Sequence, residues 1–390
     1  MPSPCREVLE RSNINPGPMI DSPEIIVVAY SARALASSAA NAGFAPLSID
    51  VFGDNDTRET SRAFMTLDGG LIDGLTHDKV AAAVEALVHA YDPIGLIYGA
   101  GFEHQPETLA AIAGKTRIIG NSAETLKRAK DPLALAQFCE ANNIRHPPIA
   151  FDPPDEPELW LTKKRGGAGG AHIARADNLN GASPDRYFQR RVAGNSISAL
   201  ILAAERKAQI IGLSMQWTAP TPASPFRYGG AAGPVEIDPR QASEIARAVA
   251  VVAAELNLIG LNSADFLVGD DAVWLVEINP RPGATLDVFE SIDAPLVARH
   301  IAACEGQFTP APATVTCKAA EIAYASHDIV MRMSRNWPDW AHDRSAPGTH
   351  IGAGDPLCTA LASGSTVDRA RARASERARE IIALVQEAEH

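Results

Sequence analysis

Between residues 24 and 120, short apolar runs alternate with segments whose apolar residues follow a helical period. This alternation constrains the fold more than any other feature, because it predicts a small parallel sheet covered by helices on both faces. The first strand-to-helix turn lacks G-x-G-x-x-G, so we do not expect a dinucleotide site there. The expected strands are 24–29, 45–51, 94–98 and 117–120, and the expected helices are 32–41, 77–91 and 107–113.

The pattern changes after a helical stretch at 123–143 and a Pro-rich acidic break at 152–157. Short strands and glycine turns then dominate, which indicates α+β structure rather than α/β. Further expected elements are a helix at 239–256, a strand pair within 262–279, strands and loops at 315–363 and a helix at 368–389. The predicted parts are an arm (1–22, with Met19 as a second candidate start), an α/β domain (23–122), two α+β lobes (123–310) and a strand-rich segment with a final helix (311–390).

The strand pair carries oxygen-bearing side chains near one end. Alternation along the second strand places Leu275, Glu277 and Asn279 on one face. A loop of three residues, 270–272, would set Asp265 directly opposite Glu277. Two carboxylates and one amide oxygen would then converge, a set that suits Mg²⁺. The alternative is a hairpin end with solvated polar tips.

A second segment ends a strand in Lys163, Lys164 and Arg165 and continues with four glycines in five positions, 166–170. Glycines let the backbone approach a phosphate closely, and a lysine supplies a positive charge. The segment is not a Walker A loop, and the alternative is a mobile surface hairpin. Taken alone, residues 128–132 are a surface charge cluster and residues 187–194 a half-exposed strand ending at a glycine.

The order and spacing of these segments resemble the ATP-grasp superfamily over residues 24–300, most specifically in D-x₁₁-E-I-N-P-R-P. Residues 30–36, 50–57 and 343–359 are similar to a subgroup of predicted ATP-dependent carboligases related to biotin carboxylase. Some members of that subgroup accompany tetrahydromethanopterin and methanofuran one-carbon pathways. The resemblance implies an ATP-grasp fold, α/β plus α+β, with a parallel-sheet N-terminal domain, two lobes around ATP, and a C-terminal extension packed on them.

The resemblance also implies roles for individual residues. This sequence departs from the family pattern at three places. Lys164 stands where proline is usual, the hinge carries no carboxylate, and Asp265 stands where Glu is more common. The implied roles are ATP-phosphate contacts for Lys130 and Lys163, a covering loop at Gly166, Gly167, Gly169 and Gly170, an adenine hinge at Gln189, Arg190, Arg191 and Val192, one or two Mg²⁺ ions at Asp265, Glu277 and Asn279, and catalysis by Arg281 with Lys163.

The implied activity is an ATP-dependent carboxylate–amine ligase that forms an acyl phosphate, with ATP and Mg²⁺ as cofactors. Ser31, Arg33 and Asp54 lie on strand-to-helix loops, where substrates often bind, although they suit solvated turns equally well. Arg33 predicts an acidic substrate such as glutamate, a glutamyl compound or a one-carbon cofactor precursor. The alternatives are a bicarbonate-activating carboxylase and an ATP-binding protein without ligase chemistry.

Composition restricts the partners and the compartment. A formal net charge of −12 argues against a general nucleic-acid binder. No apolar run approaches the ~20 residues of a membrane span. Five scattered cysteines without C-x-x-C indicate reduced thiols in a cytoplasm. The expected partners are small carboxylates and amines, without nucleic acid or membrane, in a possible homodimer.

Overall fold

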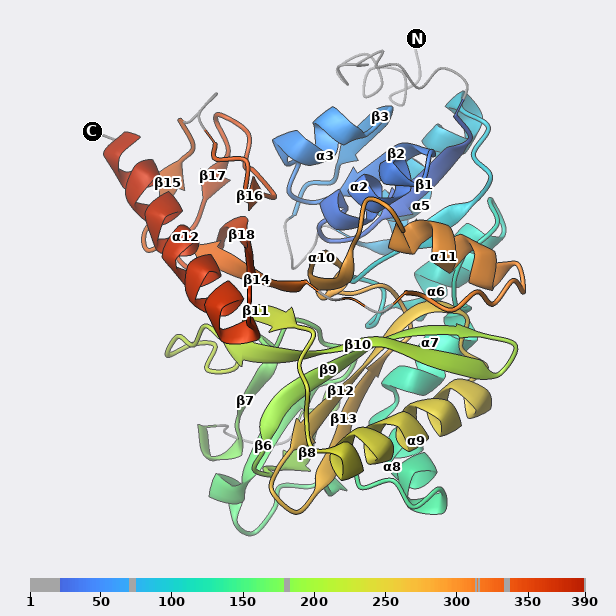
Figure 1. The fold of residues 1–390 in the computed structure, drawn as a ribbon, viewed down its shortest axis with the longest axis vertical. Coiled ribbons are helices and arrows are strands. Elements are labelled where there is room, and N and C mark those ends of the chain that lie inside the picture. Colours follow the sequence, from blue (N-terminus) through green and yellow to red (C-terminus); the bar gives the residue numbers. More distant parts are fainter. Residues whose placement is uncertain are drawn as a thin grey trace.

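The computed structural model describes residues 22–69, 75–178, 183–312, 314, 316–332 and 337–388. The N-terminal sheet and the C-terminal helix α12 (Val367–Ala388) lie toward one end of the molecule, with β16 (Ala341–His342) and β18 (Pro356–Gly364) between them, and a small lobe lies at the other end (Figure 1). A long central sheet runs between them. Within these ranges, none of the helices combines the length and the apolar character that a membrane crossing needs.

The N-terminal sheet is parallel, with strand order β3-β2-β1-β4, as the alternating pattern predicted. The expected strand at 117–120 reduces to a single parallel bridge between Leu96 and Ile118. A short strand and a short helix that we did not predict lie at 63–66 and 55–60. The elements are β1 (Glu24–Val28), α2 (Arg33–Asn41), β2 (Ala45–Asp50), α3 (Asn55–Thr60), β3 (Ala63–Thr66), α5 (His77–Ala90), β4 (Leu96–Tyr98) and α6 (Pro106–Ala113).

The helix expected at 123–143 is two helices, α7 (Ala123–Lys130) and α8 (Pro132–Ala141). The break has a local cause, because proline disfavours helical backbone at the preceding residue and is well placed at the first position of a helix. The Asp131 side chain caps α8 by accepting a hydrogen bond from the Leu133 amide at 2.9 Å. As a result, Lys130 is the last residue of α7.

The small lobe contains an antiparallel sheet with strand order β5-β8-β6-β7. Lys163 pairs with Tyr187, and Leu161 pairs with Gln189. The glycine-rich segment, residues 165–172, therefore connects two neighbouring strands. The elements are β5 (Ile149–Ala150), β6 (Trp160–Lys164), β7 (Ile173–Arg175) and β8 (Arg186–Arg190).

The central sheet has eight strands in the order β13-β12-β9-β10-β11-β14-β18-β16. The C-terminal strands β14, β18 and β16 are therefore part of this sheet. The C-terminal segment was expected only to pack on the two lobes. Its strands are β9 (Asn195–Ala204), β10 (Lys207–Thr218), β11 (Tyr228–Gly233), β12 (Gly260–Val268), β13 (Val273–Asn279), β14 (Cys317–Tyr324), β16 (Ala341–His342) and β18 (Pro356–Gly364). The remaining elements are α9 (Pro239–Glu255), α10 (Leu286–Phe289), α11 (Leu296–Cys304), β15 (Ile329–Val330), β17 (His350–Ile351), α12 (Val367–Ala388) and short 3₁₀ turns at Pro157–Leu159 and Ala176–Asn178.

The β12–β13 hairpin confirms that Asp265 lies opposite Glu277, but it corrects how that pairing arises. The loop has four residues, not three, because Val268 pairs with Val273. A register shift after Asp265 then restores the pairing, so that one additional residue of β13 is accommodated. Leu275 and Ile278 both join the core beneath the sheet. The prediction that Leu275 shares a face with Glu277 was therefore wrong.

Candidate active site

Three oxygen-bearing side chains meet on the face of the β12–β13 hairpin that points away from the core. The Asn279 amide nitrogen donates to Asp265 Oδ2 at 3.0 Å. From the end of α7, the Lys130 ammonium donates to Glu277 Oε1 at 2.5 Å and to Asn279 Oδ1 at 2.6 Å. The structure therefore brings together all three predicted metal ligands and one predicted phosphate ligand.

This oxygen cluster fits a divalent cation. Asp265 Oδ1 and the hydroxyl of Ser198, which lies across from it on β9, are buried and have no partner within 3.5 Å, although the Ser198 hydroxyl is near enough to lower the pKa of Asp265. The positive charge between Glu277 and Asn279 is supplied by the Lys130 ammonium. Among the described residues, no three or more His, Cys, Asp or Glu side chains form a metal site by themselves. Two carboxylates and an amide oxygen suit Mg²⁺ that also keeps waters or phosphate oxygens.

The two carboxylates have opposite electrostatic surroundings. Burial raises the pKa of Asp265, and the nearby negative charge of Glu277 raises it further. Burial would also raise the pKa of Glu277, but Lys130 and Lys163 outweigh this effect and hold it below its usual range. Glu277 is thus a permanent anion between two lysines, whereas Asp265 gains most from a bound cation.

Arg281 follows β13 and is buried against a carboxylate that the sequence analysis missed. Its Nε and Nη2 atoms lie 2.8 and 2.6 Å from Oε1 of Glu103, in the turn after β4. Nη2 also donates to Asn279 Oδ1 at 3.3 Å. Burial would raise the pKa of Glu103, but Arg281 and Lys130 lower it. The only sequence signal for Glu103 was its place at the carboxyl end of a parallel strand, two residues after Gly101.

Lys163 and Lys164 differ strongly in their surroundings. The Lys163 side chain is buried, whereas Lys164 is exposed. Burial lowers the pKa of Lys163, and the nearby charge of Lys130 lowers it further, although Glu277 opposes both effects. No described residue forms a hydrogen bond or ion pair with the Lys163 ammonium. This ammonium therefore faces the Glu277 cluster with donors that no described protein group engages.

The glycine loop lies against two other parts of the molecule. A Cβ at Gly166 would fall 2.5 Å from the Glu103 carbonyl oxygen, and one at Gly170 would fall 2.0 Å from that of Phe226. Both glycines have positive φ, which side chains rarely tolerate. The Tyr228 amide donates to the Gly169 carbonyl at 3.0 Å. Only glycine permits these approaches, and the loop bridges the small lobe, the N-terminal domain and the central sheet.

The predicted adenine hinge follows β8. Gln189 is buried, with its amide nitrogen 3.5 Å from Nε2 of His146. The backbone amides of Arg190 and Arg191 donate to the carbonyls of Pro148 and Leu159, each at 2.8 Å. The side chains of these two arginines are exposed. A base at this position would therefore meet carbonyl groups or the backbone of Val192 rather than the two arginine amides.

The predicted substrate residues lie in a different arrangement from the one expected. Two Arg33 nitrogens contact both Asp287 oxygens at 2.5 and 2.6 Å. Two further hydrogen bonds from Arg33 reach Asp343, at 3.1 and 2.9 Å. The Ser31 hydroxyl also donates to Asp343, at 2.8 Å. The forked pairing expected between Arg33 and an acidic substrate is made by Asp287 instead, so the structure does not support that role.

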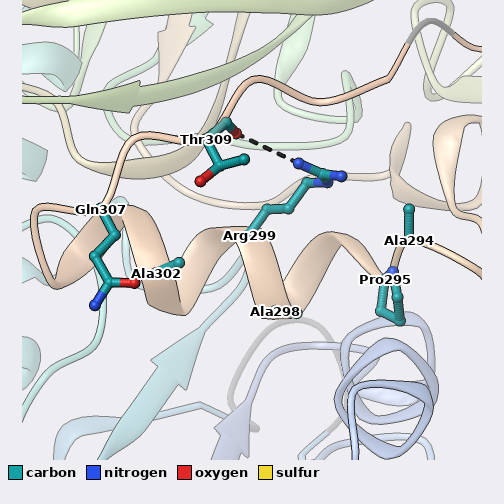
Figure 2. A pocket seen from close by; sticks show the side chains of 7 residues that line it. All are labelled: Ala294, Pro295, Ala298, Arg299, Ala302, Gln307 and Thr309. Carbon is teal, nitrogen blue, oxygen red and sulfur yellow. Dashed lines mark hydrogen bonds between the residues drawn. The ribbon is translucent and has the colours of Figure 1, made fainter.

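A separate surface hollow of about 180 Å³ lies along α11 (Figure 2). Arg299 spans it and donates to the Thr309 carbonyl at 3.4 Å. Pockets for cofactor-sized ligands usually enclose about 300–1,000 Å³. The hollow is therefore too small for a nucleotide, and none of the predicted site residues lines it.

The model of the ATP-grasp domain family matches residues 129–285, which include the glycine loop and the oxygen cluster. The large chain of carbamoyl phosphate synthase from Xylella fastidiosa is 22% identical over 317 residues, covering 73% of this chain. This chain spans 29% of the length of that relative. Residues 129–285 of the chain thus match an ATP-grasp domain.

Solved structures confirm the predicted fold over most of the chain. The biotin carboxylase domain of Hydrogenobacter thermophilus 2-oxoglutarate carboxylase, a dimer solved with MgADP, ADP and bicarbonate, gives a TM-score of 0.69 at 12% identity, with 89% of this chain and 88% of that chain covered. An L-amino acid ligase from Bacillus licheniformis gives a TM-score of 0.67 at 10% identity, with 91% and 97% covered. At these identities the likeness shows the fold alone.

Proposed function

We propose that the chain is an ATP-dependent carboxylate–amine ligase that acts through an acyl phosphate. The observation that carries the proposal is the convergence of Lys130, Lys163 and Arg281 with Asp265, Glu277 and Asn279 under one glycine loop. Phosphoryl transfer requires mainly positioning and charge neutralisation, and this set supplies both. It needs no nucleophilic serine or cysteine.

The residues divide the work by charge. Lys163 has donors that are not engaged by the described protein groups, so we assign it to an ATP phosphate. Lys130 sits between Glu277 and Asn279 and exchanges these contacts for phosphate contacts when Mg²⁺-ATP binds. The bound Mg²⁺ would neutralise phosphate charge from its place on Asp265, Glu277 and Asn279. Arg281, held by Glu103, faces the transferred phosphate, and the glycine loop excludes water.

In the proposed reaction, a carboxylate oxygen of the substrate forms a bond to the γ-phosphorus while the bond to the β-phosphate oxygen breaks. The products of this step are an acyl phosphate and ADP. An amine nitrogen then bonds to the acyl carbon, phosphate leaves, and the nitrogen loses a proton. The carboxylate is, in this proposal, glutamate or a glutamyl or one-carbon cofactor precursor, and the enzyme is a cytoplasmic homodimer.

A bicarbonate-activating carboxylase is the second candidate function. The carbamoyl phosphate synthase relative and the biotin carboxylase neighbour favour it. The L-amino acid ligase neighbour favours amide formation instead. ADP release measured with carboxylate and amine panels, and separately with bicarbonate, distinguishes the two candidates. Release that depends on an amine supports the ligase, and release that bicarbonate alone supports indicates the carboxylase.

The metal assignment is tested by Glu277→Gln, which removes the permanent anion of the cluster while keeping its size. We expect ADP release to fall about a thousandfold or more, because a bound metal contributes several kcal/mol to transition-state stabilisation. The thermal unfolding midpoint should stay near that of the wild type. Asp271→Asn, in the exposed turn of the same hairpin, is the matched control and should retain full activity. A Glu277→Gln enzyme with most of the wild-type kcat would refute the assignment.

A further inference from the structure

The C-terminal segment, from β14 onward, meets the rest of the chain in two places. At the N-terminal domain, the backbone amides of Asp343 and Arg344 donate to the two Asp56 oxygens at 2.8 and 3.0 Å. Asp54, predicted to contact a substrate, lies beside this contact and is only 3% exposed, so the contact is a sealed interface. The second contact pairs β14 with β11, which stand next to each other above the small lobe in Figure 1.

The second contact lies directly behind the residues that receive the glycine loop. These residues are 226–228, which we call the docking strip. The Tyr228 amide donates to the Gly169 carbonyl at 3.0 Å. A Cβ at Gly170 would fall 2.0 Å from the Phe226 carbonyl oxygen, so the loop backbone lies against the strip. The position of the docking strip therefore sets the place where the loop can close.

The middle residue of the docking strip, Arg227, ties the strip to the C-terminal segment. Its Nη1 atom donates to the Gly354 carbonyl at 2.7 Å, and its Nε atom donates to the Ala219 carbonyl at 2.9 Å. The guanidinium carbon also lies 3.5 Å from the centroid of the Tyr324 ring, within the range of a cation–π contact. A planar guanidinium can stack on a ring and donate in two directions at once, which an ammonium does less well. Arg227 thus fixes the strip from several sides.

Tyr324, the last residue of β14, adds a second tie to the docking strip. Its hydroxyl donates to the Tyr228 carbonyl at 2.7 Å. The backbone of Tyr228 is therefore held by the C-terminal segment through its carbonyl and offers its amide to the glycine loop. A loop that closes on a partner already fixed in place gives up less freedom than one whose partner must also be ordered.

We propose that Arg227 and Tyr324 are positioning residues for the glycine loop, through which the C-terminal segment sets how firmly the loop closes over ATP. This inference rests on the proposed function, which requires a loop that covers the ATP phosphates. It gives a part in the reaction to Tyr324, which lies outside residues 129–285, the range that matches the ATP-grasp domain. In the described part of the chain, neither side chain forms a hydrogen bond or ion pair with the oxygen cluster, so both act through the loop.

Limited trypsin digestion of the nucleotide-free full chain measures how well the loop is docked. Lys164 and Arg165, at the start of the loop, are exposed, and mass spectrometry gives the rate of cleavage after them. This rate follows the population of the open loop. We expect Tyr324→Phe, which loses one hydrogen bond, to be cleaved there about three- to tenfold faster than the wild type, and Arg227→Met about tenfold faster or more.

Two further variants calibrate the digestion. Gly170→Ala cannot approach the Phe226 carbonyl and marks the cleavage rate of an undocked loop. Arg371→Met is the matched control, because it removes a guanidinium contact, 4.6 Å from the Trp217 ring, between α12 and the same sheet. Arg371→Met should be cleaved after Lys164 and Arg165 at the wild-type rate.

Binding of the non-hydrolysable ATP analogue AMP-PNP with Mg²⁺, measured by titration calorimetry, tests the consequence for the nucleotide. We expect Tyr324→Phe and Arg227→Met to bind it about threefold more weakly or worse, since part of the binding energy must then order the docking strip. The bound analogue should slow cleavage of the loop more in the wild type than in either variant. Arg371→Met should bind the analogue as the wild type does.

Wild-type cleavage of the loop and wild-type affinity in both variants would overturn the inference. Faster cleavage at all trypsin sites, together with a lower thermal unfolding midpoint, would also overturn it, because that result shows a general loss of stability. If Arg227→Met fails to fold, Tyr324→Phe decides, since it removes a single oxygen atom. The expected changes in cleavage and affinity together with no amine-dependent ADP release would support the inference and refute the proposed ligase alone.

Discussion

At the scale of single residues, burial separates two adjacent lysines that the sequence could not distinguish by charge. Lys163 is 5% exposed and faces the Glu277 cluster, whereas Lys164 points to solvent. We expect Lys163→Ala to raise the KM for ATP about tenfold or more, since a charge-assisted contact to phosphate is lost. Lys164→Ala should leave it within about twofold, as exposed charges contribute little. Steady-state ADP release at varied ATP measures both, and the opposite ranking would show that Lys164 is the phosphate ligand.

Glu103 positions Arg281 in the proposed mechanism and does not itself contact the reacting groups. Glu103→Gln keeps one oxygen for the two Arg281 nitrogens but removes the charge that holds the guanidinium, and its NH₂ group cannot accept the hydrogen bond from the Gly101 amide. We expect kcat to fall about ten- to a hundredfold, as a misplacement of a catalytic group of about 1 Å does, with the KM for ATP nearly unchanged. Steady-state kinetics measure kcat and the KM for ATP separately, and the thermal unfolding midpoint verifies that the variant is folded. A parallel rise in KM, or a loss explained by unfolding, would assign Glu103 a structural role only.

The residue-level predictions were most successful where chemistry was local. The spacing D-x₁₁-E-x-N predicted Asp265 opposite Glu277, which the structure reaches through a longer loop and a register shift. The lysine–glycine sequence marked a loop that lies against the N-terminal domain and the central sheet, and its role over ATP stays a prediction. The face of Leu275 was mispredicted because a β-bulge has no clear sequence signal in an apolar strand. Glu103 was missed because its partner Arg281 is 178 residues away, and no local pattern indicates a pairing at that distance.

At the scale of elements, strand and helix types were predicted well and their ends less well. The prediction of a single helix at 123–143 did not take into account the steric effect of Pro132, which separates α7 from α8. The short apolar run at 117–120 was predicted as a strand, but it makes a single β-bridge. The position of the C-terminal strands within the central sheet was not predictable, because sheet order depends on contacts between distant segments.

Glu290, after α10, connects three helices and provides a test by pH. Its Oε2 atom accepts from the Ser38 hydroxyl on α2 at 2.7 Å and from the Leu296 amide of α11 at 3.3 Å. Burial raises its pKa to about 7, although the hydrogen bond from Ser38 opposes this. The folded state therefore holds the proton more tightly than the unfolded state does. Its stabilising effect is present below about pH 4 and is lost as the pH rises through about 7.

Glu290→Gln should remove this pH dependence, because the amide oxygen can keep the Oε2 hydrogen bonds without ionising. We expect the variant to match the wild type at pH 5 and to exceed it at pH 8 by on the order of 1–3 kcal/mol. Urea unfolding at both pH values measures the difference. Glu140→Gln, which alters an exposed carboxylate on α8, is the control and should show no such trend. A Glu290→Gln variant less stable than the wild type at pH 8 would contradict the predicted sign.

At the scale of the whole molecule, Arg33 joins three segments that lie far apart in the sequence. It belongs to α2, its partner Asp287 belongs to α10, and its partner Asp343 follows β16. The separations are 254 and 310 residues. From the sequence, Arg33 was expected on the first strand-to-helix loop, at the start of the helix 32–41, and in the structure it is the first residue of α2. Its partners could not be predicted. The same arginine that was expected to bind a substrate therefore connects the N-terminal domain with the rest of the chain.

This arrangement predicts a large effect for Arg33→Met, which keeps much of the side-chain volume but leaves Asp287 and Asp343 as unpaired buried charges. We expect a loss of about 3–5 kcal/mol in the free energy of unfolding, which is usual when one partner of a buried ion pair is removed. Arg117→Met, which removes an exposed ion pair with Glu305, should cost no more than about 1 kcal/mol. The double variant Arg33→Met/Asp343→Asn should recover part of the loss, since one stranded charge is gone. Urea unfolding measures all three variants, and an Arg33→Met variant as stable as Arg117→Met would show that Arg33 does not hold the molecule together.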